Sequence, residues 1–324
     1  MQLMQSRKFG RLGWPVSEIG YGLWGMGGWS GSNDDESLAS LDRSIALGCT
    51  FFDTAHAYGN GKSEQLLGQV LARHRDKTLR IATKVPPKNL RWPAKPEYPL
   101  ADVFPADHIR QCTETSLSNL GLQSVDLQQF HVWTDAWAED DRWQRAIDDL
   151  KREGLIRGFG ISINRWQPDS VLKAISTGVV DSIQVVYNIF DQSPEDELFP
   201  KCRELGVAVI ARVPFDEGSL AGALERGMTW PEGDWRNLYF TPDKLDETLD
   251  RVEAVKDDLP PQLSLPDAAL RFILSCRDVT TTIPGMRRVG HVEQNLAASD
   301  AGPLSPPLVA KLRPHRWNRT YVVM

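Results

Sequence analysis

The chain alternates short β-rich apolar stretches with helical stretches, and this alternation limits the folds that it can adopt. Strands that alternate with helices pair in parallel, because each helix returns the chain to the same edge of the sheet. Eight strands are predicted, at residues 19–23, 50–53, 79–84, 125–131, 156–162, 182–187, 207–212 and 280–283. Eight strand-helix units close a parallel sheet on itself, so the sequence predicts an α/β fold of the (β/α)8 TIM barrel type, as one domain over residues 1–324.

Helices are predicted between these strands, at residues 35–47, 64–73, 106–120, 140–153, 167–176, 196–205 and 266–276. An N-terminal β-hairpin at 8–16 and extra C-terminal helices at 289–298 and 307–312 stand outside the eight-fold pattern. Two irregular segments, 86–105 and 214–242, exceed the usual loop length, which is typical of functional loops. Their Trp92, Trp230 and Trp235 would suit the rim of a substrate site or would pack the loops onto the scaffold, and both interpretations stay open.

Composition narrows the possible partners. The 324 residues are 41% hydrophobic and 25% charged, ordinary values for a globular protein, and no stretch approaches the roughly 20 apolar residues of a membrane helix. A net charge of −6, with lysines and arginines spread along the chain, indicates no basic patch for nucleic acid. The four cysteines include no CxxC pair, which favours reduced thiols over a disulfide framework or a metal site. The first residues lack an apolar signal-peptide run, so we expect a cytoplasmic protein that binds small molecules.

A glycine-rich stretch from Gly20 to Gly25 fits the GxGxxG template of a Rossmann dinucleotide site. That template requires a helix to open at its third glycine, so that the helix N-terminus meets the phosphate. Here helical periodicity starts only near Asp34. We therefore interpret the glycines as room for a ligand, or for a tight turn, at the end of the first strand. A Rossmann-type dehydrogenase stays an alternative that would need this loop and not the residues described next.

Four polar residues end or follow predicted strands. Asp53, Lys84 and His131 end the second, third and fourth strands, and Tyr58 follows Asp53 by five positions. The carboxyl ends of barrel strands meet on the face that carries the active site, so we expect these side chains to converge. Singly, each has a structural explanation as a helix cap, a loop aromatic, a solvated strand end or a buried histidine. Their combination favours catalysis.

The set suits carbonyl reduction. Hydride addition leaves an alkoxide that must receive a proton near pH 7, and a free tyrosine with a pKa of about 10 is a poor donor there. We expect the Lys84 ammonium to lower the pKa of Tyr58, and Asp53 to hold Lys84 in position. His131 would donate a hydrogen bond to the carbonyl oxygen or help to relay the proton. In reverse, the same residues would oxidise an alcohol.

The stretch from Asp53 to Gly59, followed by Ser63-Glu64 and Leu67-Gly68, resembles the active-site block of the aldo-keto reductase superfamily. Lys84 in IATK and His131 in QFH stand where that family has its catalytic lysine and histidine, and residues 160–162 resemble its GxS element. The likeness extends over nearly the whole chain. Residues 210–222 resemble the xARVPFxxGxLxG stretch of one bacterial branch. The resemblance implies a carbonyl-alcohol oxidoreductase that uses NADP(H), with Tyr58 as general acid and base.

The resemblance also implies how the cofactor is held. Ser162 and Gln184 would hydrogen-bond the nicotinamide carboxamide, whereas Asn164 departs from the family spacing because Ile163 intervenes. Arg212 stands where many members place an aromatic ring beneath the nicotinamide; it would stack with added positive charge, or serve as an internal ion-pair partner.

Residues 214–220 would cover the pyrophosphate. Residues 283–288 would meet the 2′-phosphate, because arginine suits a phosphate, and so favour NADPH over NADH. The expected cofactor residues are Leu23, Trp24, Ser162, Asn164, Gln184, Arg212, Val213, Pro214, Phe215, Gly218, Leu220, Ile283, Gly285, Arg287, Arg288, His291, Gln294 and Asn295. The expected substrate residues are Trp24, Tyr58, His131 and Trp133.

The same family includes potassium-channel β subunits, which keep the barrel and the cofactor but act as regulatory partners, so the fold alone does not fix the function. The complete set of four residues favours active catalysis, and a regulatory protein stays the alternative. Substrate identity, the direction of the reaction and the oligomeric state cannot be read from the sequence. We expect an apolar aldehyde or ketone and favour a monomer, since many relatives are monomers.

Overall fold

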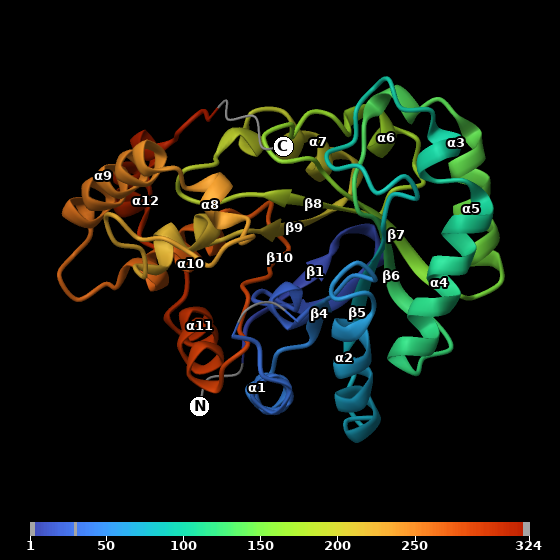
Figure 1. The fold of residues 1–324 in the computed structure, drawn as a ribbon, viewed down its shortest axis with the longest axis horizontal. Helices are drawn as coiled ribbons and strands as arrows, with labels where there is room; N and C mark the ends of the chain where they lie inside the picture. Colours follow the sequence, from blue (N-terminus) through green and yellow to red (C-terminus); the bar gives the residue numbers. More distant parts are fainter. Residues whose placement is uncertain (1–3, 29–30, 320–324) are drawn as a thin grey trace.

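Eight parallel strands form the centre of the molecule (Figure 1). The computed structural model describes residues 4–28 and 31–319. In one sheet the strands follow the order β10-β9-β8-β7-β6-β5-β4-β3. They span Tyr21–Gly22 (β3), Phe51–Asp53 (β4), Arg80–Val85 (β5), Val125–Phe130 (β6), Ile156–Ser162 (β7), Ser182–Val186 (β8), Ala208–Arg212 (β9) and Thr281–Thr282 (β10). Each lies within one residue of a predicted strand or inside it, and the predicted (β/α)8 fold is confirmed.

The barrel closes where its first and last strands meet. Isolated parallel bridges join Ile19 to Thr282 and Gly22 to Gly285, and the Gly22 N–H donates to the Pro284 carbonyl at 3.0 Å. A Cβ on Gly22 would lie 2.6 Å from the Ile283 carbonyl oxygen, so only glycine allows the two chains to approach this closely. Gly22 of the GxGxxG match therefore serves barrel closure. Gly25 lies in the short 3-10 helix η2 (Trp24–Met26), and the first α-helix, α1, begins at Asp34, as the sequence predicts.

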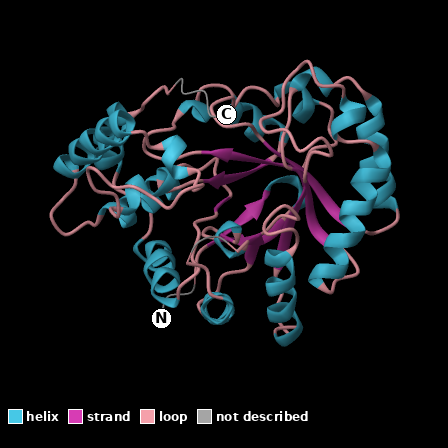
Figure 2. Cartoon of the chain, viewed as in Figure 1, coloured by secondary structure: helices cyan, strands magenta, loops and turns pink. Residues whose placement is uncertain are grey.

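Helices surround the sheet (Figure 2). Those of the eight-fold pattern are α1 (Asp34–Ala46), α2 (Lys62–Arg73), α4 (Ala106–Leu120), α5 (Asp141–Arg152), α6 (Leu172–Ser176), α7 (Leu198–Leu205) and α10 (Leu265–Leu274), and α11 (Val289–Ala301) and α12 (Pro306–Leu312) follow. The predicted hairpin is present as β1 (Ser6–Phe9) and β2 (Trp14–Ser17). Its Phe9 and Val16 pack on barrel residues such as Phe51 and Leu127, so the hairpin covers one end of the barrel interior.

The long segments contain more helix than predicted. The first includes α3 (Leu100–Val103), and the second includes the 3-10 helix η5 (Asp216–Ala221) and α8 (Arg236–Tyr239). A 17-residue helix that the sequence analysis did not identify, α9 (Pro242–Asp258), follows directly. Thr241 followed by Pro242 is a helix-start signal, and the buried Leu245, Leu249 and Val252 recur at helical spacing. The sequence pattern therefore predicts this helix.

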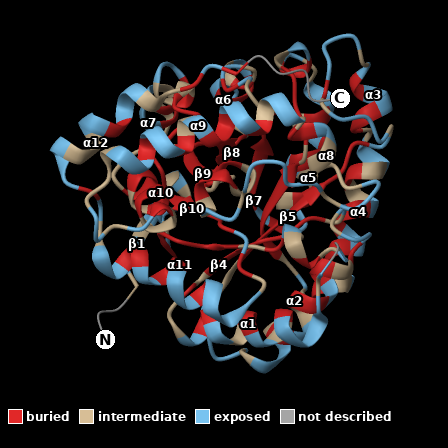
Figure 3. Ribbon diagram, turned by 60° about the vertical axis from the view of Figure 1, so that its left-hand side comes forward, coloured by how far each residue is buried: buried red, intermediate tan, exposed pale blue. Residues whose placement is uncertain are grey.

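Burial follows the layers, with buried residues on the strands and inner helix faces and exposed residues on the outer faces (Figure 3). A cluster of stacked and edge-on aromatic rings lies beside β6, made of Phe104, Phe130, Trp133, Trp137, Trp143 and Phe159. Within residues 4–28 and 31–319, every helix is too short or too polar to cross a membrane.

Candidate active site

The four predicted catalytic residues converge at the carboxyl ends of β4, β5 and β6. Asp53 is the last residue of β4, Lys84 lies near the end of β5, and His131 directly follows β6. The Lys84 ammonium forms a fully buried ion pair with Asp53 and donates to the Thr54 carbonyl at 2.8 Å. It also lies 3.4 Å from the Tyr58 hydroxyl oxygen. The Tyr58 and His131 rings meet edge to face, with centroids 5.6 Å apart.

Tyr58 is set by a tight turn between β4 and α2. Gly59 follows it with a φ of 63°, and a Cβ there would lie 2.3 Å from the Gly27 carbonyl oxygen. The turn therefore needs glycine both for its left-handed backbone and for its contact with the loop after β3. Buried Ser63 and Glu64 hold the other side: the Glu64 carboxylate accepts from the Thr83 hydroxyl at 2.5 Å, which ties α2 to β5. The Ser63 N–H also donates to the Tyr58 carbonyl at 3.2 Å, so these contacts fix the turn that carries Tyr58.

Two glutamines complete the surroundings of Asp53. Its Oδ2 accepts from the Gln184 amide at 2.8 Å and from the Gln129 amide at 3.0 Å. The sequence analysis assigned Gln184 to the cofactor and did not single out Gln129. The contact of Gln129 depends on the register that sets β6 beside β5, which the sequence pattern did not define.

The pKa of Tyr58 departs from the sequence-based expectation. Burial raises it, and the opposing effect of the Lys84 ammonium does not outweigh burial, so the pKa lies above its ordinary value of 10. The predicted net lowering is wrong in direction, because the sequence names the neighbouring charge but not the depth of burial. Tyr58 is consequently a neutral phenol, ready to donate its proton, throughout the neutral range.

Lys84 and His131 each have a single charge state near pH 7. Burial alone would lower the pKa of Lys84, but the Asp53 carboxylate and Tyr58 offset this effect and raise it, so Lys84 is an ammonium. Burial, together with the positive charges of Lys84 and Arg212, holds the pKa of His131 well below 6.5. His131 is therefore a neutral imidazole that can donate one hydrogen bond.

Tryptophans flank the tyrosine and the histidine. Trp92, from the segment after β5, meets the His131 ring edge to face at 4.6 Å between centroids. Trp24, after β3, contacts Trp235 of the segment after β9. Trp24 and Trp92 are each 43% exposed, and Trp92 presents apolar surface beside His131. Trp133 does not: it is fully buried in the aromatic cluster and donates to Asp135, which corrects the expectation that it contacts substrate.

The predicted nicotinamide residues lie on or directly after the neighbouring strands β7, β8 and β9. Ser162 on β7 pairs in register with Gln184 on β8. Arg212 ends β9, and its guanidinium reaches across to donate to the Ile163 carbonyl at 3.0 Å. Burial, reinforced by the charge of Arg165, lowers the pKa of Arg212 to about 10, so it stays charged at neutral pH. The Asn164 side chain hydrogen-bonds both the N–H and the carbonyl of Ala94.

The segment after β9 is held by ion pairs from distant parts of the chain. Val213, Asp216 and Glu217 all have positive φ angles, which non-glycine residues rarely adopt. Glu217 pairs with Arg165 of the loop after β7, and Asp216 pairs with the buried Arg319 at 2.6 Å.

Pro214, Phe215 and Gly218 lie along this segment, whose Leu220 is fully buried. Leu23, after β3, is fully buried as well. Their contact with the cofactor stays a prediction.

A group of basic residues begins α11. Arg287, Arg288 and His291 are close enough that the two arginines help burial to lower the pKa of His291. Arg288 is the N-cap of α11, and its side chain makes no capping hydrogen bond, so the first amides of this 13-residue helix remain available to an acceptor. Ile283 and Gly285 precede the group, and Gln294 and Asn295 follow it on α11, the first exposed and the second buried.

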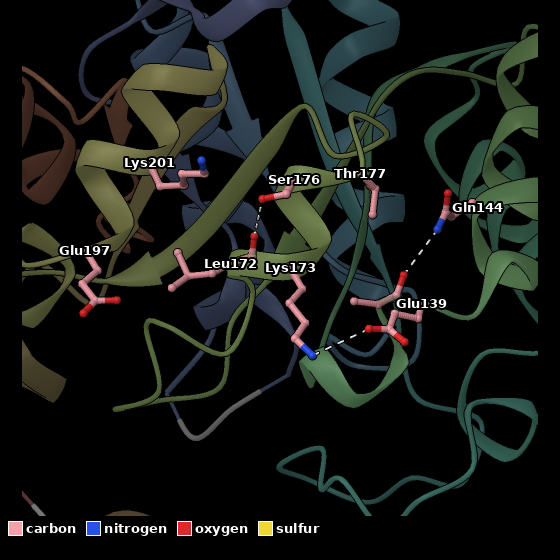
Figure 4. A pocket seen from close by; sticks show the side chains of 9 residues that line it. Glu139, Gln144, Leu172, Lys173, Ser176, Thr177, Glu197 and Lys201 are labelled. Carbon is pink, nitrogen blue, oxygen red and sulfur yellow. Dashed lines mark hydrogen bonds and ion pairs between the residues drawn. The ribbon is translucent and has the colours of Figure 1, made fainter.

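A depression of about 780 Å³ lies outside the barrel, lined by residues of α5, α6 and α7 and of the connection before α5 (Figure 4). Lys173 pairs with Glu139 across it. None of the four converging residues lines it, and we assign it no role in the chemistry.

Comparison with known proteins agrees with this arrangement. The model of the Aldo/keto reductase family matches residues 18–316. The uncharacterized oxidoreductase YqkF of Bacillus subtilis (strain 168) is 28% identical over 314 residues, covering 96% of each chain. The NADH-specific methylglyoxal reductase of Escherichia coli (strain K12) is 27% identical over 304 residues, covering 87% of this chain and 90% of that protein.

A solved structure is similar over almost its full length. The aldo-keto reductase AKR11C1 from Bacillus halodurans, in its holo form, has a TM-score of 0.77 and 27% identity, and 98% of each chain is covered. With the family match over residues 18–316, these findings define the class: the chain belongs to the aldo/keto reductase family of oxidoreductases.

Proposed function

We propose that this chain is an NADP(H)-dependent oxidoreductase that interconverts an aldehyde or ketone and its alcohol, with Tyr58 as general acid and base. The observation that carries the proposal is the buried series Asp53, Lys84 and Tyr58, with His131 beside the Tyr58 ring. One phenol proton, one fixed ammonium and one neutral imidazole donor are what a carbonyl oxygen needs as it gains negative charge.

The residues fit a nicotinamide dinucleotide. Ser162 and Gln184 offer a hydroxyl and an amide side by side for a carboxamide, and the Arg212 Nε is buried without a hydrogen-bond partner among the described residues. At the far end, Arg287 and Arg288 stand at the helix N-terminus, a combination that suits a phosphate dianion. Family membership does not fix the choice of cofactor, since one relative is named NADH-specific. The two arginines are our reason for proposing NADPH.

When bound, the nicotinamide supplies the hydride that adds to the carbonyl carbon. Tyr58 and His131 would orient the carbonyl by hydrogen bonds to its oxygen. Tyr58 would then transfer its hydroxyl proton to that oxygen, and the adjacent Lys84 ammonium would stabilise the resulting phenolate. Asp53 holds Lys84 in place, and solvent returns a proton to Tyr58 after the alcohol leaves. The reverse sequence oxidises the alcohol, with the phenolate as base.

Substrate surface is proposed at Trp92, whose ring meets His131, and at Trp24, whose partly exposed ring follows β3 and meets Trp235. This favours an apolar carbonyl compound of moderate size.

The test is fluorescence titration of the purified protein with NADPH and NADH, followed by NADPH consumption with a panel of aromatic and aliphatic aldehydes. Tight NADPH binding with turnover of an aldehyde supports the proposal. Tight binding without turnover across the panel would favour a regulatory role of the kind found in potassium-channel β subunits. Absence of binding to either cofactor would overturn the proposal.

A further inference from the structure

We infer that Gln129 is a positioning residue of the catalytic site, which acts on Tyr58 through Asp53 and Lys84. The inference rests on the proposed function and adds to it Gln129, the first residue of the QFH stretch, to which the family resemblance assigned no role.

Among the described residues, the Gln129 side chain makes one hydrogen bond. Its side chain lies inside the barrel and is fully buried, and its amide nitrogen donates to Asp53 Oδ2 at 3.0 Å. Its amide oxygen has no hydrogen-bond partner among the described residues. The contact with Asp53 is therefore what orients this amide.

Room for this side chain comes from Gly160, the first residue of the GxS element. Gly160 pairs in register with Gln129, and a Cβ on Gly160 would lie 3.1 Å from the Gln129 Cγ and 2.3 Å from the Ser182 hydroxyl. The missing side chain lets Gln129 lie between β6 and β7 while its amide meets Asp53. The glycine of this element thus serves the catalytic site as well as the sheet.

Gln129 differs from Gln184, the second amide on the same carboxylate oxygen. Gln184 on β8 pairs in register with Ser162, the last residue of β7, where we propose that it also meets the carboxamide. Gln129 pairs instead with Lys84 in the register of β6 and β5, and we propose no contact between Gln129 and the cofactor. It can hold Asp53 whether or not a cofactor occupies the site, so the Asp53 Oδ1 stays directed at Lys84.

The contact between Gln129 and Asp53 affects the pH at which Tyr58 loses its proton. The charged groups that act on it are Lys84 on β5, Asp53 on β4 and Arg212 on β9, and the neutral His131 meets its ring. Lys84 is the nearest cation, and its charge opposes the effect of burial on the phenol. If Asp53 loses the Gln129 contact, Lys84 is held less firmly beside Tyr58, and phenolate forms only at higher pH. Alcohol oxidation, which needs the phenolate, should lose the most.

The chain offers a matched control in Gln128, the preceding residue of β6. It is also fully buried, but successive residues of a strand face opposite sides, and neither of its amide atoms has a hydrogen-bond partner among the described residues. Gln129→Met and Gln128→Met therefore make the same chemical change at the same depth, once with and once without a contact to Asp53.

The experiment measures the rate of alcohol oxidation against pH for the full-length wild type and both variants, with NADPH affinity by fluorescence. Gln129→Met should move the rising limb to higher pH and lower the rate at pH 8 by about tenfold, the size expected for a lost hydrogen bond to a charged group. NADPH affinity should stay within about twofold, and Gln128→Met should change neither quantity. In an Asp53→Asn background, Gln129→Met should have no further effect.

A second readout needs no turnover. The Tyr58 signal of protein labelled with ¹³C at the tyrosine Cζ, assigned by its loss in Tyr58→Phe, should titrate later in Gln129→Met than in wild type or Gln128→Met. The inference is overturned if Gln129→Met and wild type share the same Tyr58 titration and the same pH dependence of alcohol oxidation, even if Gln129→Met loses activity or stability. If the titration moves while wild type reduces no carbonyl compound, the positioning role stands and the proposed function fails.

Discussion

The two halves of the barrel build their parts of the site in different ways. The half formed by β4, β5 and β6 carries Asp53, Lys84 and His131 at its strand ends. Buried hydrogen bonds join Asp53 to Lys84 and to Gln129, and the His131 ring meets the Tyr58 ring. The half formed by β7 to β10 relies on a segment with positive φ angles, on ion pairs such as that of Arg319 with Asp216, and on basic residues before α11. The first half is preorganised by the sheet, and the second is assembled from loops that distant residues hold. Chemistry and cofactor affinity should therefore fail separately.

The largest expected effect comes from removing the hydroxyl of the first half. Tyr58→Phe keeps the ring and its contact with His131 but deletes the proton donor, so kcat for carbonyl reduction should fall by more than about a hundredfold. NADPH affinity, measured by fluorescence titration, should stay nearly unchanged because the binding residues lie in the other half. Substantial remaining turnover would refute the role of Tyr58.

A large loss of stability is expected in the second half. Arg319→Ala leaves the buried Asp191 and Asp216 without their cation and should lower the free energy of unfolding by about 3 kcal/mol in chemical denaturation. Arg316→Ala, which breaks a partly exposed pair with Asp196, is the matched control and should cost at most about 1 kcal/mol. Equal losses would mean that the buried pairs do not stabilise this segment.

A smaller and more selective effect should follow from the basic residues before α11. Replacing both Arg287 and Arg288 by Ala should weaken NADPH binding by about tenfold or more and NADH binding much less, because only NADPH carries the 2′-phosphate. The double replacement of the exposed Arg145 and Arg152 on α5 removes the same charge elsewhere. If NADPH and NADH lose affinity equally, the 2′-phosphate lies somewhere else.

The smallest expected effect is the pH dependence of the wild-type rates, which tests the first half of the site without any substitution. Since the pKa of Tyr58 is raised above 10, the phenol keeps its proton below that pH, and kcat for reduction should be flat from pH 7 to 9 and fall only above 10. Oxidation needs the phenolate and should rise with pH over the same range. No limb is expected near 6.5, because the pKa of His131 lies well below that value. A fall in reduction near pH 8 would show that the Lys84 charge outweighs burial.

The sequence predicted the barrel, and it predicted that the polar strand-end residues of the first half would converge, for a physical reason. Strand ends are marked by a change from apolar to polar residues, and barrel topology brings them together, so Asp53, Lys84 and His131 could be placed without coordinates. The direction of the Tyr58 pKa shift could not be predicted, since burial is a property of the packed site. Gln129 required the register of β6, and Trp133 required knowledge of which aromatic rings face inward. The cofactor residues came from family resemblance, and for them the arrangement supports a proposal that still requires measurement.

The meeting of Gly22 with Gly285 also bears on how the molecule is made. β3 forms early in the chain and pairs with β4 on one side, but its other neighbours, Thr282 and Gly285, lie more than 250 residues further on. A ribosome must therefore synthesise nearly nine-tenths of the sequence before the last open strand edge can be covered. Such long-range closure slows folding and exposes an unpaired edge meanwhile. The narrow glycine seam cannot form before Gly285 has been made, and a bulkier residue at position 22 should trap open barrels that aggregate.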